Sequence, residues 1–405
     1  MIKEFELAAR PYRLRNRVQH YAWGTRNEAA FIPRLLGEAV EPGRPYAELW
    51  IGAHPKAPSQ VLSDADAVPL GALIAAEPEA WLGEAVAHQF GAELPFLLKV
   101  LSAAEALSIQ AHPTQEQAAR LHERDPEHYP DANHKPEVAV ALDGLTALVG
   151  FKPWAELRAV VSAYPEIAEF GGAMELADET ALHEFYARLL RRALAEPEAL
   201  EAATARLAHR LTERQAPLSE TERLFLQLRV KYGGADVGLC SLFLFNLLHL
   251  QPGAGVYTEA GVPHAYLRGN IIECMANSDN VVRAGLTPKF KDVETLVEIL
   301  TPQMGPAPVS TGEREAGWII YRTPAAEFEL SRRELAVGER VEIATGGRIE
   351  IYLVTRGSVR LHWADETAAY GRGASFVVPA LLERFGLAAE DAAEIFRVRV
   401  PGRRL

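Results

Sequence analysis

The chain has 405 residues, 48% of them hydrophobic, so it is long and apolar enough for two or three domains with buried cores. Its formal net charge is −12 and no run is rich in lysine or arginine, which argues against nucleic acid or an anionic membrane as the main partner. We therefore expect a globular protein that acts on a small soluble ligand.

The first part of the chain is typical of short strands separated by turns. Residues 1–7 have neither the basic start nor the apolar centre of a secretory signal, so we expect a cytoplasmic protein. From residue 11 to about residue 151, β-type runs alternate with proline and glycine turn signals, which favours a barrel or a sandwich. One helix is predicted after Thr114, because Thr114 can cap it and Gln117 stands at the third position of a capping box.

A helical block is predicted from about residue 153 to residue 248. Alanine, glutamate, leucine and arginine dominate this stretch. Apolar residues recur in it at helical spacing, as in Leu190 with Leu194 and Leu207 with Leu211. This spacing predicts helices.

An apolar run, residues 238–250, ends this block. It is interrupted by Asn246 and His249, and it is shorter than the roughly 20 residues that a membrane-spanning helix needs. Cys240 in this run and Cys274 further on lack the spacing of metal ligands, and two cysteines cannot form a disulfide framework. We expect no membrane association, and we expect both cysteines to be reduced and buried.

β-type sequence returns after the helical block. Residues 251–264 restore strand and turn chemistry, so the helices interrupt a β domain rather than follow one. The chain stays rich in strand patterns beyond about residue 308, and residues 349–363 are typical of two strands joined at a glycine turn. The prediction is a mainly β protein divided into a first β part (1–152), a helical insertion (153–245), a second part of the same β domain (246–310) and a C-terminal β domain (311–405).

A faint internal repeat supports two related β units. Residues 253–264 and residues 371–380 both contain a glycine turn, a short strand and a turn of small residues. The first copy ends at His264, whereas residues 379–385 contain no histidine. If the first unit holds a metal, the C-terminal unit is therefore expected to lack an equivalent site.

The segment Ala-Leu-Ser-Ile-Gln-Ala-His-Pro-Thr, residues 106–114, combines a packing face with a polar face. In an extended strand the side chains of Ser108, Gln110 and His112 share one face. Gln110 and His112 are then about 7 Å apart along the strand, close enough for both side chains to reach one metal ion. We treat this face as a candidate site.

Two imidazoles, one carboxylate and one neutral amide suit Zn²⁺, or less selectively Mn²⁺ or Fe²⁺. The candidate donors are Gln110, His112, Glu137 and His264. Taken alone, a histidine next to a proline in a turn is more often a surface residue than a ligand. Spacing cannot join these positions, because the helical block lies between Glu137 and His264.

Several motifs together resemble one known family. They are YAWG at 21–24, ELWIGAHP at 48–55, FLLKVL at 96–101, SIQAHP at 108–113, HKPE at 134–137, GVPHAY at 261–266 and the run 272–290. Their order and spacing are similar to those of the type I mannose-6-phosphate isomerases over most of residues 12–310, while the C-terminal part matches only in texture. The resemblance implies cupin-like jelly-roll β domains with a helical domain inserted in the catalytic one, and a monomer.

The resemblance also implies a site. Its zinc ligands correspond to Gln110, His112, Glu137 and His264, with one Zn²⁺ per chain. Arg283 corresponds to an arginine beside the substrate and is a catalytic candidate, which could hold the developing oxyanion or orient the diol. The other matched candidates are Lys99, Lys135 and Asp279 in the active site, Glu273 within the matched run, Ser108 and Lys289 at the phosphate end, and Trp23 as a wall of the sugar pocket.

The implied reaction interconverts mannose 6-phosphate and fructose 6-phosphate through an enediol, without a redox cofactor. Such an enzyme would supply mannose for GDP-mannose and polysaccharide synthesis, or feed mannose into glycolysis. The base that removes the C2 proton stays open. Glu273 is favoured because apolar surroundings raise a carboxyl pKa, while Lys135, His134 and a metal-bound water remain eligible.

Two alternatives belong to other classes. One is a metal-binding cupin that binds or senses a sugar phosphate without converting it. The other is an iron oxygenase on a similar scaffold, although such sites typically use two histidines and one carboxylate with open positions. Gln110 as a further donor argues against the oxygenase.

Overall fold

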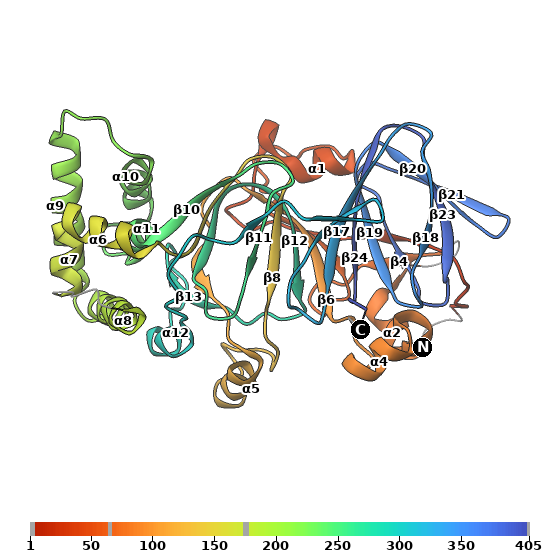
Figure 1. The fold of residues 1–405 in the computed structure, drawn as a ribbon, viewed down its shortest axis with the longest axis horizontal. Helices are drawn as coiled ribbons and strands as arrows, with labels where there is room; N and C mark the ends of the chain where they lie inside the picture. The colour runs from red at the N-terminus through yellow and green to blue at the C-terminus, as the bar shows by residue number, and fades with distance from the viewer. Residues whose placement is uncertain (1–4, 64–66, 173–177, 403–405) are drawn as a thin grey trace.

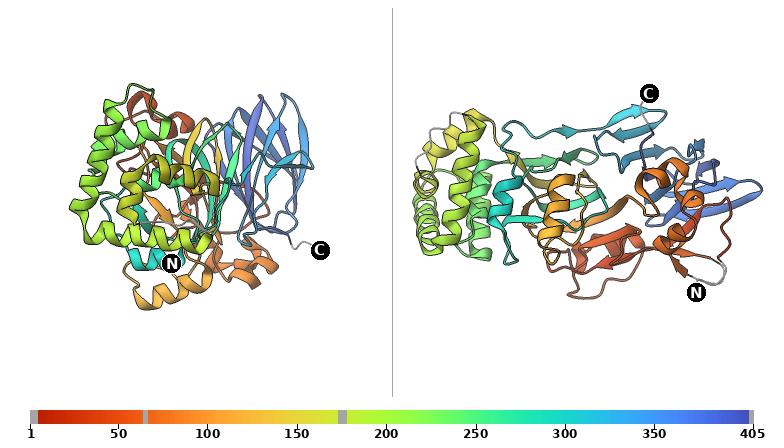
Figure 2. Two further views of the ribbon diagram at one scale, coloured as in Figure 1. Left: turned by 60° about the vertical axis from the view of Figure 1, so that its left-hand side comes forward. Right: turned by 90° about the horizontal axis from the view of Figure 1, so that it is seen from below.

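The computed structural model describes residues 5–63, 67–172 and 178–402. Figure 1 shows a helical block at one end, a large sheet in the middle and the C-terminal strands at the other end. The view from below in Figure 2 keeps the same order along the long axis. The mainly β fold with inserted helices agrees with the prediction.

The central sheet has eleven strands. They are β2 (Arg17–Gln19), β3 (Glu48–Gly52), β6 (Phe96–Ala103), β7 (Ile109–Ala111), β8 (Glu137–Ala141), β9 (Leu145–Phe151), β10 (Phe245–Leu250), β11 (Gly255–Thr258), β12 (His264–Ala276), β13 (Val282–Gly285) and β14 (Val309–Ser310). The long strand β12 pairs with β6, β7, β8 and β9, always antiparallel. It therefore connects every strand that carries a candidate metal donor.

Two further sheets hold the remaining strands. The nine-stranded sheet contains β1 (Tyr12–Arg15), β4 (Gln60–Leu62), β5 (Ala67–Pro69), β15 (Glu313–Glu315), β16 (Trp318–Tyr321), β17 (Glu329–Leu335), β19 (Glu350–Arg356), β22 (Ser375–Val378) and β24 (Ala393–Arg399). The four-stranded sheet contains β18 (Arg340–Ala344), β20 (Ser358–Trp363), β21 (Glu366–Gly371) and β23 (Arg384–Ala389). The two strands predicted across the glycine turn are β19 and β20, with Gly357 at φ 69° between them. They belong to different sheets.

The other described elements are helices. The described helices are α1 (Phe31–Leu36), α2 (Leu70–Ala76), α3 (Pro78–Leu82), α4 (Glu84–Phe90), α5 (Gln115–Arg124), α6 (Trp154–Ala163), α7 (Pro165–Gly171), α8 (Glu179–Ala195), α9 (Pro197–Glu213), α10 (Glu220–Tyr232), α11 (Gly238–Leu244), α12 (Val293–Ile299) and a 3₁₀ turn at Asn27–Ala29. Helix α5 begins with the predicted capping box of Thr114 and Gln117. Among the described residues, no helix is both long and apolar enough to cross a membrane.

Helices α6 to α11 lie between two strands that pair with each other. Strand β9 ends at Phe151 and β10 starts at Phe245, and these two residues face each other in the antiparallel pair. The helical block therefore replaces the short loop of a hairpin, so it enters and leaves the sheet at one point. Strand β10 begins at residue 245, a few residues before the end of the predicted helical block.

The leucines that indicated helices differ in their exposure. Leu190, Leu207 and Leu211 are buried in the helical core, but the side chain of Leu194 is 65% exposed. Leu194 stands near the end of α8, which ends at Ala195 before α9 turns back. Helical spacing shows which residues share a face, and it does not show where the neighbouring helix stops covering that face.

The internal repeat is visible in the strands. Strand β11 is followed by β12 at His264, and β22 is followed by β23 at Arg384, with the same spacing in both copies. Arg384 therefore occupies the position that corresponds to His264. Both predicted reduced cysteines, Cys240 and Cys274, are buried and free.

Candidate metal centre and active site

Strand β7 brings three candidate residues together. Its neighbours are β12 on one side and β13 on the other, so Gln110 stands opposite both His264 and Arg283. The side-chain amide Nε2 of Gln110 lies 3.4 Å from Nε2 of His264. Ser108 and Gln110 both line a cavity, as the strand alternation predicts, and the buried His112 continues the same face.

His112, Glu137 and His264 form a buried cluster whose donor atoms all lie within 4.8 Å of one another. Nε2 of His112 is 3.4 Å from Oε2 of Glu137, and Nε2 of His264 is 2.8 Å from Oε1. The three side chains are at most 1% exposed. Among the residues that the structure describes, this is the one such group of histidine, cysteine and acidic residues that could hold a metal ion.

Backbone carbonyls fix the protonation of both imidazoles. Nδ1 of His112 lies 2.9 Å from the carbonyl oxygen of Asn280, and Nδ1 of His264 lies 3.0 Å from that of Val262. Because a carbonyl oxygen only accepts, each Nδ1 carries the proton and donates it. In a neutral imidazole with this tautomer Nε2 carries the lone pair, and both Nε2 atoms face the Glu137 carboxylate, an arrangement that repels unless a cation lies between them.

The orphaned atoms of the cluster fit a zinc ion. Nε2 of His112 and Oε2 of Glu137 are buried and take part in no hydrogen bond, although the ammonium of Lys135 lies 3.0 Å from Oε2. Tetrahedral zinc with bonds of about 2.05 Å separates its donors by about 3.4 Å, close to the 3.4 Å between these two atoms. The residues present therefore fit a zinc site in donor type and in the separation of this pair.

Lys135 and Tyr266 also contact the Glu137 carboxylate. Nζ of Lys135 lies 3.0 Å from Oε2, and the Tyr266 hydroxyl donates to Oε1 at 3.3 Å. Burial alone would raise the pKa of Glu137, but Lys135 and the two histidines outweigh it and hold the pKa well below its usual value. Burial, followed by the charge of Lys135, lowers the pKa of His112 to about 4. Glu137 is therefore ionised and His112 neutral, which are the states that bind metal.

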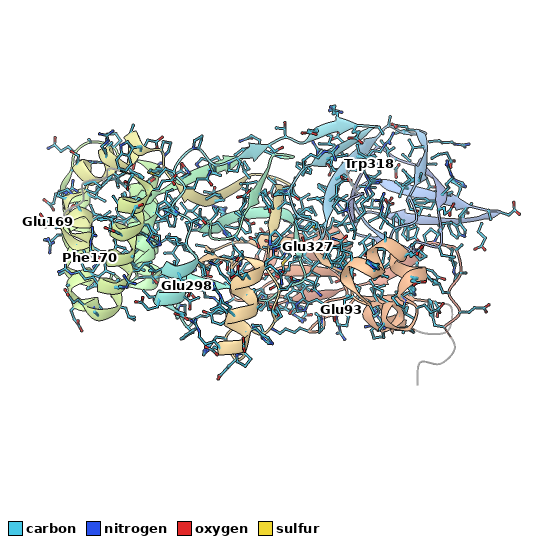
Figure 3. The ribbon with its side chains drawn as sticks, turned by 60° about the horizontal axis from the view of Figure 1, so that its bottom comes forward. Glu93, Glu169, Phe170, Glu298, Trp318 and Glu327 are labelled. Atoms are coloured by element: carbon cyan, nitrogen blue, oxygen red, sulfur yellow. The ribbon has the colours of Figure 1, made fainter. Side chains whose placement is uncertain are left out.

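A cavity of about 1150 Å³ opens beside this cluster. Its lining includes most of the candidates from the sequence, namely Trp23, Lys99, Ser108, Gln110, Lys135, Glu273, Asp279, Arg283 and Lys289. His134 does not line it. Its Nε2 lies 2.7 Å from Oε1 of Glu327, which comes from the loop between β16 and β17 and is labelled near the middle of Figure 3.

One wall of the cavity holds a buried lysine between two carboxylates. Nζ of Lys99 is 3.4 Å from Oε2 of Glu273 and 3.6 Å from Oε2 of Glu48, and Trp50 donates to Glu48 at 2.5 Å. The residues meet because β6 pairs with both β3 and β12, with Lys99 opposite Trp50 and Glu273. Glu48 was missed at the sequence level, although a charged residue at the start of an apolar strand was a visible signal.

The charged groups on this wall shift each other's pKa values. Burial alone would lower the pKa of Lys99, but Glu48 and Glu273 outweigh it and raise the pKa above its usual range. Burial, followed by the charge of Glu137, raises the pKa of Glu273, while Lys99 opposes that rise. Burial, followed by the charges of Glu137 and Glu273, raises the pKa of Tyr266 well above its usual value. Glu273 is thus a buried carboxyl near the metal cluster.

Asp279 lies at the cavity rim with two partners. Nζ of Lys56 is 2.7 Å from its Oδ2, and Nε2 of the buried His54 is 3.4 Å away. Burial alone would raise the pKa of Asp279, but His54 and Lys56 outweigh it and hold the pKa below its usual range. His54 lies in the His-Pro turn that follows β3. Nothing in the sequence distinguished Lys56 as a residue of the site.

Arg283 and Lys289 face the cavity without a carboxylate partner. In the described part of the chain neither side chain has an ion pair within 4.0 Å. Burial lowers the pKa of Arg283, while burial and then the charge of Arg283 lower that of Lys289. Two cations that line one cavity without a carboxylate partner favour an anion there.

Comparisons with known proteins identify the family of the chain. Residues 12–154 match the family model for the type I phosphomannose isomerase catalytic domain. Mannose-6-phosphate isomerase 2 of Arabidopsis thaliana is 37% identical over 415 residues, covering 96% of this chain and 94% of the relative. The mannose-6-phosphate isomerase of Bos taurus is 38% identical over 371 residues, covering 84% and 86%.

Solved structures share the whole fold. A zinc-bound mannose 6-phosphate isomerase has a TM-score of 0.83 at 31% identity, covering 98% of this chain and all of its own. A point variant of phosphomannose isomerase from Salmonella typhimurium has a TM-score of 0.87 at 31% identity, with the same coverage of this chain. Fold, buried donor cluster and sequence similarity thus confirm the resemblance seen in the motifs, and the chain belongs to the type I phosphomannose isomerase family.

Proposed function

We propose that the protein is a zinc-dependent isomerase that interconverts mannose 6-phosphate and fructose 6-phosphate. One observation carries this proposal: two lone pairs, each fixed by a backbone carbonyl, converge on an ionised buried carboxylate beside a cavity with unpaired cations. A zinc site next to an anion site suits a sugar phosphate. The names of the relatives and the zinc-bound neighbour support the same activity.

His112, Glu137 and His264 would hold the zinc ion, with Gln110 as a fourth, neutral donor. The Gln110 amide already lies against His264, and turning its oxygen inward completes the set. With Gln110 neutral, Glu137 is the one anionic ligand, which leaves the ion electrophilic. Bound zinc would supply a Lewis acid that polarises the sugar oxygens and stabilises negative charge on them.

The protein's own residues would bind the sugar phosphate and move one proton. Arg283, Lys289 and the Ser108 hydroxyl hold the phosphate end, since they line one cavity and the two cations are unpaired. Glu273 is the proposed base: it removes the C2 proton of the open-chain sugar and returns it to C1, while the hydroxyl proton passes from O2 to O1 at the enediol stage. Burial raises the pKa of Glu273, which suits a general base, and the positive charge of Lys99 opposes that rise and favours the ionised carboxylate.

Lys135 remains a second candidate for the base, because it also lines the cavity. His134 is left out of the proposal, since Glu327 holds its ring and it does not line the cavity. Exchange of the C2 proton with solvent separates the two candidates. Glu273→Gln should lose the exchange and Lys135→Met should keep it; the reverse result would move the role to Lys135.

The activity is tested by a coupled assay for fructose 6-phosphate. The purified protein is assayed as isolated, after chelation with verified metal loss, and after zinc is restored. We expect turnover to fall on chelation and to return with zinc. No turnover by the zinc-loaded protein would refute the function and favour a protein that only binds a sugar phosphate. Full turnover after metal loss would refute the zinc requirement.

The remaining expectations are part of the same proposal. We infer a division at residues 1–152, 153–245, 246–310 and 311–405, supported by the placement of α6 to α11 between β9 and β10. A cytoplasmic monomer that supplies mannose for GDP-mannose synthesis, or feeds mannose into glycolysis, is consistent with the acidic composition. Light scattering at several protein concentrations tests the monomer.

A further inference from the structure

The loop that carries Lys289 starts in a conformation that leucine rarely adopts. Residues 286–292 connect β13 to α12 and present Lys289 to the cavity. Leu286, the first residue of this loop, has a φ of 54°, in the left-handed region that favours glycine. Its side chain is buried in the core shared with the helical block. Some interaction must therefore hold the backbone of this loop in place.

Asp236 provides that interaction from the helical block. It lies between α10 and α11 and is 6% exposed. Its Oδ1 accepts two backbone N–H groups, that of Leu286 at 2.8 Å and that of Gly238, two residues along its own segment, at 2.8 Å. Its Oδ2 accepts the N–H of Thr287 at 3.3 Å and lies 4.0 Å from Nζ of Lys291. One buried carboxylate thus ties the helical block to the loop.

The two backbones also meet without room for side chains. A Cβ added to Gly285 would lie 2.5 Å from the nitrogen of Gly238, and a Cβ added to Gly238 would lie 2.8 Å from the nitrogen of Leu286. Such contacts require glycine on both sides. The carboxylate of Asp236 therefore acts across an interface that is already close-packed, and a small displacement there moves Lys289.

We propose that Asp236 is a positioning residue for phosphate binding: the helical block, through this carboxylate, fixes loop 286–292 so that Lys289 faces the cavity that Arg283 also lines. This inference rests on the proposed function. A different role makes the opposite prediction, because Asp236 also lines the cavity. If its negative charge merely repelled the phosphate, its removal would tighten binding. The sign of the effect decides between the two roles.

The test compares Asp236→Ala and Asp236→Asn with wild type and with Asp178→Ala. Asp178 belongs to the same helical block and caps α8, where its Oδ1 accepts the N–H of Ala181 at 2.9 Å, and it is part of neither the cavity lining nor loop 286–292. Each zinc-loaded protein is assayed for KM and kcat with mannose 6-phosphate and for inhibition by inorganic phosphate. Calorimetry measures the Kd of inorganic phosphate without any need for turnover, and zinc content is checked by metal analysis.

We expect D236A to raise KM and the phosphate Kd by at least about tenfold with a much smaller change in kcat, since a binding group misplaced by about 1 Å can cost up to about a hundredfold. D236N should raise both about threefold or more, because its amide can still accept from Leu286 but presents an N–H to Thr287. D178A should lower the melting temperature, because it removes a helix cap, and should leave KM and Kd unchanged.

Each possible result is decisive. Wild-type KM and Kd in folded D236A, or tighter binding, would overturn the positioning role. If D236A does not fold, D236N decides, and unchanged or tighter phosphate binding by D236N overturns the role as well. A wild-type protein that binds phosphate without turnover would refute the isomerase activity and leave this inference intact. A wild-type protein that binds no phosphate would overturn the inference.

Discussion

Replacing Lys99 by methionine should move the pH dependence of the reaction. Lys99 is the buried cation nearest to Glu273, with Nζ 3.4 Å from Oε2. The side chains of Lys99 and Glu273 are 9% and 4% exposed, so water screens their attraction little. Methionine fills a similar volume without the charge, and Glu273 then faces Glu48 and Glu137 without this neutralising partner.

The size of the shift follows from the distance. Two unit charges 3.4 Å apart attract by about 5 kcal/mol at an effective dielectric constant of 20. One pKa unit corresponds to about 1.36 kcal/mol, so the upper limit is a rise of about 3.5 units in the pKa of Glu273. Because Glu48 shares Lys99, we expect a rise of at least about 1.5 units.

The variant should lose activity at a higher pH than the wild type when the solution is acidified. A base must be ionised, so activity falls as the pH drops through its pKa, and raising that pKa moves the fall to higher pH. The assay is kcat/KM for mannose 6-phosphate from pH 5 to pH 9 with zinc-loaded protein. The control is Lys56→Met, because Lys56 is 64% exposed and pairs with Asp279 instead. An active, folded Lys99→Met enzyme with the acid limb of the wild type would refute Glu273 as the base.

Three stability predictions can be checked by thermal and chemical denaturation. Thr114→Ala removes the capping box of α5 and should cost about 1 kcal/mol in the free energy of unfolding, measured in urea; no loss would contradict the role of the cap. Glu222→Gln breaks the pair with Arg214 at 2.6 Å and should cost about 1 to 3 kcal/mol at pH 7. Burial alone would raise the pKa of Glu222, but Arg214 outweighs it and lowers the pKa below 4.5, so this pair stabilises above that pH and the melting temperatures of the two proteins should converge as the pH falls below it. Leu194→Gln should change stability by less than about 0.5 kcal/mol, because the side chain is already exposed, and a large loss would mean that Leu194 is packed in solution.

Local features of the fold were predictable, because they depend on residues close in sequence. The capping box of Thr114 and Gln117 is complete within one turn of α5. The alternation of Ser108, Gln110 and His112 follows from strand geometry alone. The exposure of Leu194 was not predictable, because it depends on where a neighbouring helix ends, and no local pattern records that position.

The site could be predicted in part. Residue types suggested the four donors, but the resemblance to a family was needed to join them, since Gln110 and His264 are 154 residues apart. The carbonyls of Asn280 and Val262 that fix the imidazoles were not predictable, because any residue can supply a carbonyl. Asp236 follows two glycines and an alanine in an unremarkable loop, and only the folded chain shows that it bonds Leu286.

The separation of Gln110 from His264 also sets the order in which a working molecule can be made. A ribosome adds about 5 to 20 residues per second, so roughly 8 to 30 s pass between the two residues. During that time His112 and Glu137 exist without their third partner, and the whole helical block must emerge first. Metal loading is therefore a late event in the life of each nascent chain, and a truncated translation product cannot assemble the complete donor set.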